Sequence, residues 1–140
     1  MDTTTFSINT GDQFGIVDLT DRVAAWVQDR GDGLCNLLAQ HATAGLGLME
    51  MGSGSERDAQ TVLRALLPRD DIYAHRHGSP GHGGDHVLPL VVSPSLTLPV
   101  VDGGLVLGTW QSIVFVDPNV DNPRRRVHAA FMADRQVGQR

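Results

Sequence analysis

The sequence predicts an α+β fold in which two helices pack on a largely antiparallel or mixed β-sheet. Two segments carry apolar residues at the i, i+3, i+4 spacing of an amphipathic helix, and much of the remainder reads as short alternating runs typical of strands. Clusters of Gly, Pro and Asp separate these runs. The 140 residues, 41% of them hydrophobic, match the size of one domain with one core, over residues 1–140.

The first helix is predicted to begin at Thr20, a residue type that caps helix N-termini. The apolar residues that follow fall on one helical face: Val23, Trp26 and Val27. Gly31 and Gly33 indicate that the helix has ended. The next run, residues 34–50 (LCNLLAQHATAGLGLME), is too densely apolar for a solvent-facing helix and contains two glycines. It predicts two strand segments or one long bent strand.

The second helix is predicted to begin at Ser55, because Asp58 three residues later gives a capping-box-like pattern. The helix then carries a single apolar stripe made of Ala59, Val62, Leu63 and Leu66. Pro68 ends it. Residues 71–86 (DIYAHRHGSPGHGGDH) are rich in Gly and His and almost free of apolar side chains, which predicts a long loop.

Strands are predicted for most of the chain after residue 86, for a total of about six to eight. They are expected at residues 87–92, 95–101, 105–117 and 126–132, with a turn at 102–104 and a frayed tail over 133–140. Along the 105–117 strand, Thr109 and Gln111 share a face with apolar residues, so we expect them at a pocket floor or a subunit seam. Trp110 points the other way and is predicted to be core.

The charge balance narrows the range of partners. The formal net charge is -5, and the main basic cluster is Arg124-Arg125-Arg126, which argues against nucleic acid or an anionic membrane as the main partner. The opening stretch, MDTTTFSINTGDQ, lacks the basic and apolar regions of a signal peptide, and no window is apolar enough for a membrane helix. We therefore expect a cytoplasmic protein.

Two features of the composition exclude whole classes of site. All eleven cationic residues are Arg, so Schiff-base enzymes, pyridoxal-phosphate enzymes and Walker-type nucleotide sites, which require Lys, are excluded. Cys35 is the single cysteine, which excludes an internal disulfide and zinc sites built from several thiolates. Any metal ion must be held by His and carboxylate side chains.

Four of the six histidines lie between residues 75 and 86, and His41 follows a run that resembles a buried strand. Three convergent imidazoles with an open fourth position describe a catalytic zinc site. The other interpretation is that a Gly-rich exposed loop simply tolerates histidine, and no HExxH motif decides between the two. His128 is isolated in the last strand and is interpreted as structural.

Residues 95–113 (SLTLPVVDGGLVLGTWQSI) resemble the signature of the YjbQ-like family, often labelled secondary thiamine-phosphate synthase, and the LGTWQ core is highly specific. Further landmarks occur in the family's order: IVDLTDRV at 16–23, GLCNLLAQHATA at 33–44 and YAH at 73–75. The likeness covers about residues 14–127 of the chain.

The resemblance implies an α+β homotrimer whose pocket is lined by three histidines, which correspond to His41, His75 and His86. It implies a divalent metal ion, such as zinc, at these residues. Glu50 stands at the family's acidic position. Its candidate roles are a general base or a group that orients an imidazole, and the alternative is a solvated carboxylate with no role in the site. The other candidate catalytic residues are Thr43, Gln111 and Asp117. His77 and His82 are expected to be loop residues outside the site.

The function implied by the resemblance is a small metal-assisted enzyme with weak thiamine-phosphate synthase activity. Because that reaction expels pyrophosphate, it needs cations, and Arg124 and Arg125, with Arg126 and the metal, are candidates to bind a phosphorylated ligand. The chain departs from the family pattern by losing hydrogen-bonding groups at Ala42, Met49 and Arg76. These losses favour the alternative, a non-catalytic homotrimeric module that binds a metal or small ligand. A plain structural or interaction protein is the third reading.

Overall fold

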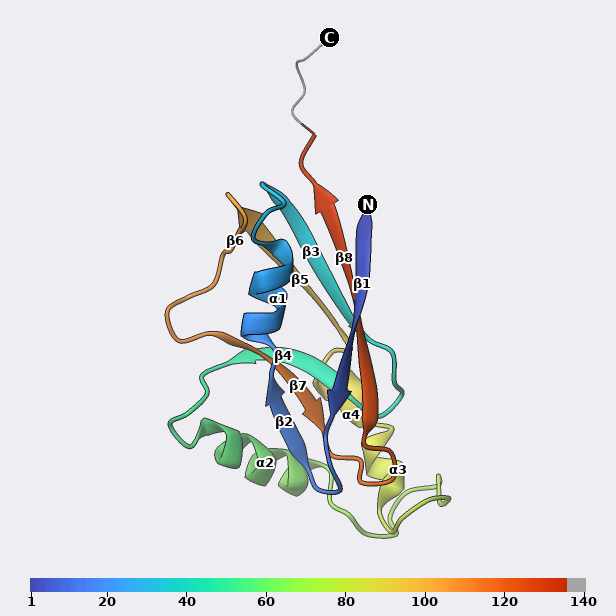
Figure 1. Ribbon diagram of the computed structural model, residues 1–140. Coiled ribbons are helices and arrows are strands. Elements are labelled where there is room, and N and C mark those ends of the chain that lie inside the picture. Colours follow the sequence, from blue (N-terminus) through green and yellow to red (C-terminus); the bar gives the residue numbers. More distant parts are fainter. Residues whose placement is uncertain (136–140) are drawn as a thin grey trace.

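The computed structural model describes residues 1–135, and its strands form two antiparallel sheets (Figure 1). The five-stranded sheet has the order β1 (Asp2–Asn9), β8 (Arg124–Ala133), β3 (Gly33–Ala39), β5 (Ser95–Val101) and β6 (Gly104–Leu105). The three-stranded sheet has the order β2 (Gly15–Asp18), β7 (Ser112–Asp117) and β4 (Gly45–Met49). The α+β class and the predicted strand number are thereby confirmed for residues 1–135.

Both predicted helices are present, as α1 (Thr20–Val27) and α2 (Ser55–Leu66). Their predicted caps do not form. Thr20 is the first helical residue, and its hydroxyl donates to Asp18 Oδ1 at 2.6 Å and accepts the Ile113 N–H at 2.8 Å. α2 begins after Gly54, whose left-handed backbone turns the chain into the helix without a side-chain cap. Apolar periodicity therefore located these helices better than their capping patterns did.

The main core lies where α1 packs between the two sheets, and it includes Val23, Val27, Leu37, Leu98 and Phe115. A smaller apolar cluster joins the three-stranded sheet to α2 and to the short helix α4 (Leu88–Val91), around Leu88, Val114 and Val116. α1 covers one face of the five-stranded sheet, whereas α2 lies next to β2 at the lower end of the molecule (Figure 1). Residues 34–50 form two strands in different sheets, β3 and β4.

The prediction of a single strand over residues 105–117 is wrong. This segment contains parts of two strands, β6 and β7, which belong to different sheets and are joined by a loop. Within that loop the Gln111 N–H donates to Gly108 O at 3.1 Å, and Gln111 Oε1 accepts the Gly108 N–H at 2.8 Å. This turn leaves Trp110 73% exposed, so its prediction as core is also wrong. The Gln111 side chain closes this turn on the Gly108 backbone, in a run whose apolar residues otherwise read as continuous.

Three further elements differ from the predictions. Residues 87–92 contain the helix α4 instead of a strand, because Pro89 fits the first helical turn and Leu88 is fully buried there. The predicted loop over residues 71–86 ends in a short helix, α3 (His82–Asp85). At the other end of the chain, β1 pairs along its whole length with β8.

None of the helices described combines the length and apolar composition that a membrane-spanning segment requires. β8 continues to Ala133, the first residue of the predicted frayed tail. Most of that tail, residues 136–140, lies outside the described residues.

Candidate metal site

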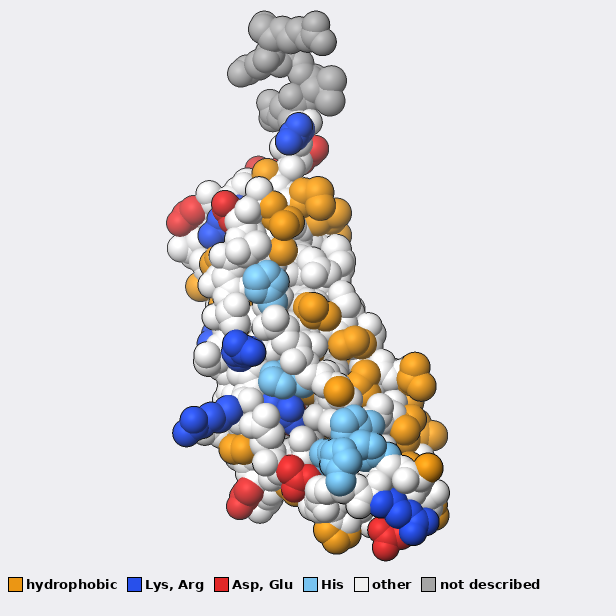
Figure 2. Space-filling view, turned by 90° about the vertical axis from the view of Figure 1, so that its right-hand side faces the viewer, with side chains coloured by type: hydrophobic (Ala, Val, Ile, Leu, Met, Phe, Trp, Pro, Cys, Tyr) orange, Lys and Arg blue, Asp and Glu red, His pale blue; other side chains and the backbone are white. Residues whose placement is uncertain are grey.

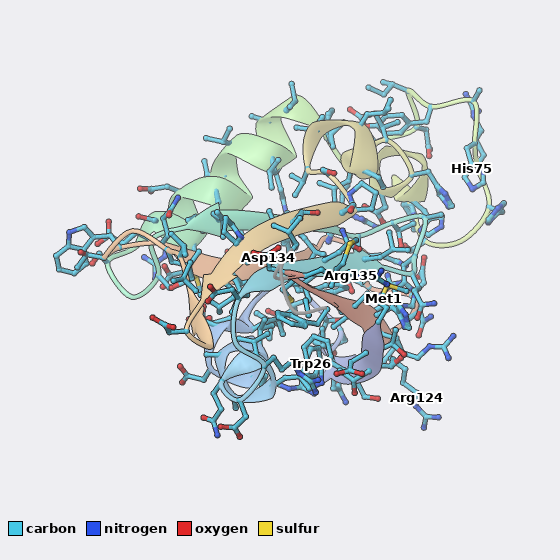
Figure 3. The ribbon with its side chains drawn as sticks, turned by 90° about the horizontal axis from the view of Figure 1, so that it is seen from above. Met1, Trp26, His75, Arg124, Asp134 and Arg135 are labelled. Atoms are coloured by element: carbon cyan, nitrogen blue, oxygen red, sulfur yellow. The ribbon has the colours of Figure 1, made fainter. Side chains whose placement is uncertain are left out.

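Four histidines gather around α3 at the lower end of the molecule. The His75 ring lies 3.9 Å from the His77 ring and 4.3 Å from the His86 ring, measured between centroids. The His82 and His86 rings lie 4.8 Å apart. They form the large pale-blue patch in Figure 2, and Figure 3 shows His75 on a loop at the edge of the molecule. Four histidines from a segment that was predicted to be a loop therefore form one cluster.

Close packing on Tyr73 gives α3 its position. A Cβ atom on Gly83 would lie 2.5 Å from Tyr73 Cβ, and one on Gly84 would lie 2.7 Å from the Tyr73 hydroxyl oxygen. The Tyr73 hydroxyl donates to Pro68 O at 2.8 Å, which holds the ring in place. The sequence HGGDH therefore forms a tight helical turn, and its i, i+4 spacing puts His82 and His86 on the same side.

His75, His82 and His86 form the trio that could hold a metal ion, because one ring nitrogen from each lies within 4.8 Å of the others. The Nε2 atoms of His82 and His86 are 3.0 Å apart. A tetrahedral zinc ion bound to nitrogen at its usual bond length separates two ligand atoms by about 3.3 to 3.4 Å. The His82–His86 spacing is slightly shorter than that separation, and all three pairs lie within 4.8 Å, so the rings must move to reach tetrahedral geometry.

The surroundings of His75 and His86 favour their neutral imidazoles. Burial lowers the pKa of His86, and the neighbouring rings of His75, His82 and His77 lower it further, although Asp85 opposes them. The pKa of His75 is lowered by loss of hydration and by the rings of His77 and His82. Metal ions bind the neutral form of histidine, so these shifts suit ligation near neutral pH.

His41 lies outside this trio, and His82, predicted to be a loop residue, takes the expected third place. His41 Nε2 accepts the Arg126 N–H at 2.8 Å, which occupies that ring nitrogen inside the fold. Burial and the Arg125 guanidinium lower the pKa of His41. His77 meets the His75 ring edge-on without being a member of the trio, and His128 lies in β8 with Thr5 Oγ1 3.4 Å from its Nδ1.

Thr43, Asp117 and Arg125 do come together, as a buried polar network at the carboxyl end of β7. Arg125 donates from Nε and Nη2 to the two carboxylate oxygens of Asp117, at 2.7 Å and 3.1 Å, and from Nη2 to Thr43 Oγ1 at 2.9 Å. Asp117 is completely buried. The Arg125 guanidinium is therefore engaged within the fold, and Arg124 is exposed on the opposite face of β8. These two arginines do not form a joint phosphate site.

The remaining predicted catalytic residues, Glu50 and Gln111, lie at the other end of β7. Glu50 follows β4, Gln111 precedes β7, and the adjacent residues Met49 and Ser112 pair with each other. β7 spans six residues, or roughly 17 Å between its ends. α3 lies beyond its carboxyl end (Figure 1). The structure therefore does not bring Glu50 and Gln111 to the histidine trio.

A cavity of about 180 Å³ adjoins the trio. Its lining combines basic, acidic and hydroxyl side chains: His75, His82, Arg76, Asp70, Asp71, Tyr73 and Ser79. The Arg76 guanidinium is tied to the loop, donating from Nε to Tyr73 O at 3.1 Å and from Nη2 to Asp71 O at 3.2 Å. The imidazole and guanidinium side chains offer donors to a small polar ligand, and Asp70 and Asp71 add negative charge to the same cavity.

Sequence reasoning missed His82, Arg69 and Asp121. Arg69 donates to both carboxylate oxygens of Asp85, and Asp121 lies 3.0 Å from His82 Nδ1. The i, i+4 spacing of His82 and His86 was the available signal, but it is visible only if the Gly-rich segment is assumed to be helical. Arg69 and Asp121 come from segments that carry no motif.

Comparisons with known proteins agree with this fold. The sequence pattern described as UPF0047 protein YjbQ-like matches residues 4–134. The UPF0047 protein Rv2556c of Mycobacterium tuberculosis is 54% identical over 132 residues, covering 94% of this chain and 98% of that protein. The UPF0047 protein YugU of Bacillus subtilis is 30% identical over 129 residues, covering 87% of this chain and 92% of that protein.

Solved structures show the same architecture. The hypothetical protein APE1520 of Aeropyrum pernix superimposes with a TM-score of 0.86 at 27% identity, covering 96% of this chain and all of the other (100%). A Sulfolobus solfataricus protein described as YbjQ-like and of unknown function gives a TM-score of 0.88 at 24% identity, covering 95% of this chain and 97% of that chain. Because the Sulfolobus solfataricus protein is only 24% identical, its similarity shows the fold alone.

Proposed function

We propose that this chain, which belongs to the YjbQ-like family UPF0047, binds a divalent metal ion through His75, His82 and His86 and acts on a small anionic substrate. The observation that carries the proposal is the convergence of three ring nitrogens within 4.8 Å of one another. Zinc is the best fit, because it accepts three imidazole ligands and leaves a fourth tetrahedral position for water.

The chemistry proposed is hydrolysis or group transfer at that fourth position. A zinc ion held by three histidines supplies Lewis acidity and a water molecule of lowered pKa. The Arg76 guanidinium, fixed by two backbone carbonyls, is placed to orient a carboxylate or phosphate group in the adjoining cavity. His77 contacts His75 at the exposed side, where it is suited to carry a proton to or from solvent.

Thiamine-phosphate synthase activity stays a prediction from the resemblance. The cavity of about 180 Å³ is small for two phosphorylated heterocycles, since pockets for drug-sized ligands occupy about 300 to 1,000 Å³. The expected phosphate ligands Arg124 and Arg125 are also separated, one exposed and one engaged with Asp117. A single small substrate therefore fits the chain better than that pair of substrates.

A non-catalytic metal- or ligand-binding module is the second candidate. It is favoured by the buried network, in which Thr43, Asp117 and Arg125 bond to one another, so that these predicted site residues are not free to act on a substrate. Turnover separates the candidates: we expect the metal-loaded protein to hydrolyse members of a panel of small phosphate and carboxylate esters, and a binding module to leave the whole panel intact.

We also propose that the chain forms the homotrimer implied by the resemblance, through the uncovered face of the five-stranded sheet. Because α1 packs on the opposite face, this one is open to solvent and carries exposed apolar side chains: Leu34 (46%), Leu38 (40%), Val101 (54%) and Met132 (60%). Leu34 pairs across the sheet with both Pro99 and Met132, so the apolar residues are adjacent. Figure 2 shows apolar side chains along one side of the molecule, some of them beside the histidine patch. Analytical ultracentrifugation tests this proposal. The wild type is expected to sediment as a trimer, and the Leu34→Glu variant, which places a charge on this face, as a monomer.

Metal analysis tests the proposed site. Protein purified without a His-tag and loaded with zinc is expected to retain about one ion per chain, as three imidazoles are enough for a structural or catalytic site. His82→Ala and His86→Ala should lose the ion, whereas His128→Ala, the matched control, should keep it. A His41→Ala variant that loses zinc, together with a His82→Ala variant that keeps it, would contradict the proposed trio and restore the one expected from sequence.

A further inference from the structure

We infer that Asp121, supported by Ser79 and by the Arg69–Asp85 pair, positions His82 as a metal ligand by holding its Nδ1–H and so directing the Nε2 lone pair toward the other two histidines. The inference rests on the proposed metal site and adds the group that prepares it. Asp121 is a positioning residue: it touches His82 and not the ion.

The two edges of the His82 ring face different surroundings. Nε2 lies 3.0 Å from His86 Nε2, within the trio. Nδ1 lies 3.0 Å from Asp121 Oδ2 and 3.4 Å from Asp85 Oδ2. The residue is 8% exposed, and Nδ1 itself is buried away from water. One edge of a buried imidazole thus meets carboxylates while the other meets prospective ligands.

His82 Nδ1 is close to both carboxylates yet makes no hydrogen bond to any described residue, because the direction of its N–H is unsuitable. A buried polar atom without a partner is uncommon and destabilising. A modest rotation of the ring would point Nδ1–H at Asp121.

Both carboxylates are held in place by other groups. Asp121 Oδ2 accepts the Ser79 N–H at 3.2 Å and the Ser79 hydroxyl at 3.0 Å. Arg69 Nη1 donates to the Asp85 oxygens at 2.7 Å and 2.9 Å, and Arg69 Nη2 donates to Ser79 Oγ at 2.9 Å. Two carboxylates and one guanidinium therefore form a connected support on the far side of His82.

Asp121 is the partner of His82, since it is the nearer carboxylate and since Arg69 occupies both oxygens of Asp85. A neutral imidazole carries its proton on one nitrogen, and an adjacent carboxylate fixes it there. A proton held at Nδ1 leaves Nε2 as an acceptor, the form that binds a metal ion. Carboxylate–histidine–metal arrangements of this kind set the ring's orientation and strengthen ligation.

The test measures zinc affinity of the full chain by competition with a chromophoric chelator. Asp121→Ala is expected to weaken zinc binding about 10- to 100-fold, and Asp121→Asn, which keeps a neutral acceptor, to weaken it less. Asp70→Asn is the matched control: it removes a negative charge from the lining of the same cavity, and Asp70 makes no ion pair with any described residue. Equal affinities for wild type and Asp121→Ala would overturn the inference.

A second readout does not need metal. Imidazole ¹⁵N chemical shifts of the zinc-free protein are expected to show His82 as the Nδ1–H tautomer in the wild type, and to shift toward the Nε2–H tautomer in Asp121→Ala. An Nε2–H tautomer in the wild type would overturn the inference. If the wild type binds no zinc while the tautomer depends on Asp121, the proposed metal function fails and the positioning role stands. Thermal melting of each variant establishes that it is folded.

Discussion

His82 Nε2 and His86 Nε2 lie 3.0 Å apart, at the two ends of the short helix α3, which His82 begins and His86 caps and which contains two glycines. At this distance either one imidazole donates a hydrogen bond to the other or both face a common ion. The pair also depends on backbone packing, because the glycines between the two histidines contact Tyr73 directly. Metal binding, protonation of the imidazoles and substitution of the glycines should therefore all alter the spacing of these two Nε2 atoms.

We expect zinc binding to persist below the pH at which ordinary histidines release metal. The pKa values of His75 and His86 are lowered, chiefly by burial, so their imidazoles stay neutral until the pH falls below the usual value of about 6.5. Protons then compete with zinc only in more acidic solution. Equilibrium dialysis between pH 8 and pH 4.5 checks this, and zinc loss already half complete at pH 7 would contradict it.

Gly83→Ala should weaken both the fold around α3 and the metal site. The new methyl group would lie 2.5 Å from Tyr73 Cβ and 2.6 Å from His75 O, so the helix or the His75 loop must move. Overpacking of this kind costs about 1 to 3 kcal/mol. Chemical denaturation and zinc titration should both register the change.

Gly47→Ala is the control for that substitution. A Cβ atom there would meet only Val114 Cγ2, at 4.0 Å, in β4, a strand that contributes no residue to the trio. Its stability should be equal to that of the wild type or slightly higher, since Ala restricts the unfolded chain more than Gly. Equal zinc affinity in the Gly83→Ala and Gly47→Ala variants would show that α3 does not set the ligand positions.

Arg125→Met is expected to destabilise the protein by about 3 to 5 kcal/mol, the usual cost of leaving one charge of a buried pair without its partner. Asp117 is fully buried and would lose both hydrogen bonds from the guanidinium. Arg124→Met, on the exposed face of the same strand, should change the free energy of unfolding by less than about 0.5 kcal/mol. Urea denaturation of the two variants gives the comparison directly, and similar free energies would contradict the structural role of the pair.

Cys35 should resist alkylation in the native protein at pH 8. It is completely buried, and burial raises the pKa of its thiol to about 11, although the Arg30 guanidinium opposes the shift. The reactive thiolate is therefore scarce as well as inaccessible. Because the native pKa lies above the unfolded value, the thiol's contribution to stability is complete below about pH 8.5 and is lost as the pH rises toward 11.

Time courses with a thiol reagent check the prediction for Cys35. Labelling should be slow in buffer and fast in denaturant, and a Cys35→Ser variant gives the background. Rapid stoichiometric labelling of the folded chain would show that β3 opens far more readily than its pairing with β5 and β8 implies.

Several elements followed from residue patterns alone. The spacing of Val23 and Val27 predicted α1, and the density of apolar residues in 34–50 predicted strand structure that appears as β3 and β4. These predictions hold because side-chain periodicity reports directly which face of a local element is buried. The same reasoning failed for residues 105–117, since a turn between two apolar strands preserves the apolar pattern while sending the strands to different sheets.

Only part of the candidate site could be predicted from residue patterns. The amino-acid sequence by itself determined the available chemistry: imidazole and carboxylate ligands, arginine as the cation, and a single cysteine. Only the tertiary structure decided that His82 and not His41 joins His75 and His86, and that Asp117 pairs with Arg125 instead of facing a ligand. The physical reason is that convergence depends on close approach between segments far apart in the chain, here the packing of α3 on Tyr73, and no local pattern encodes such an approach.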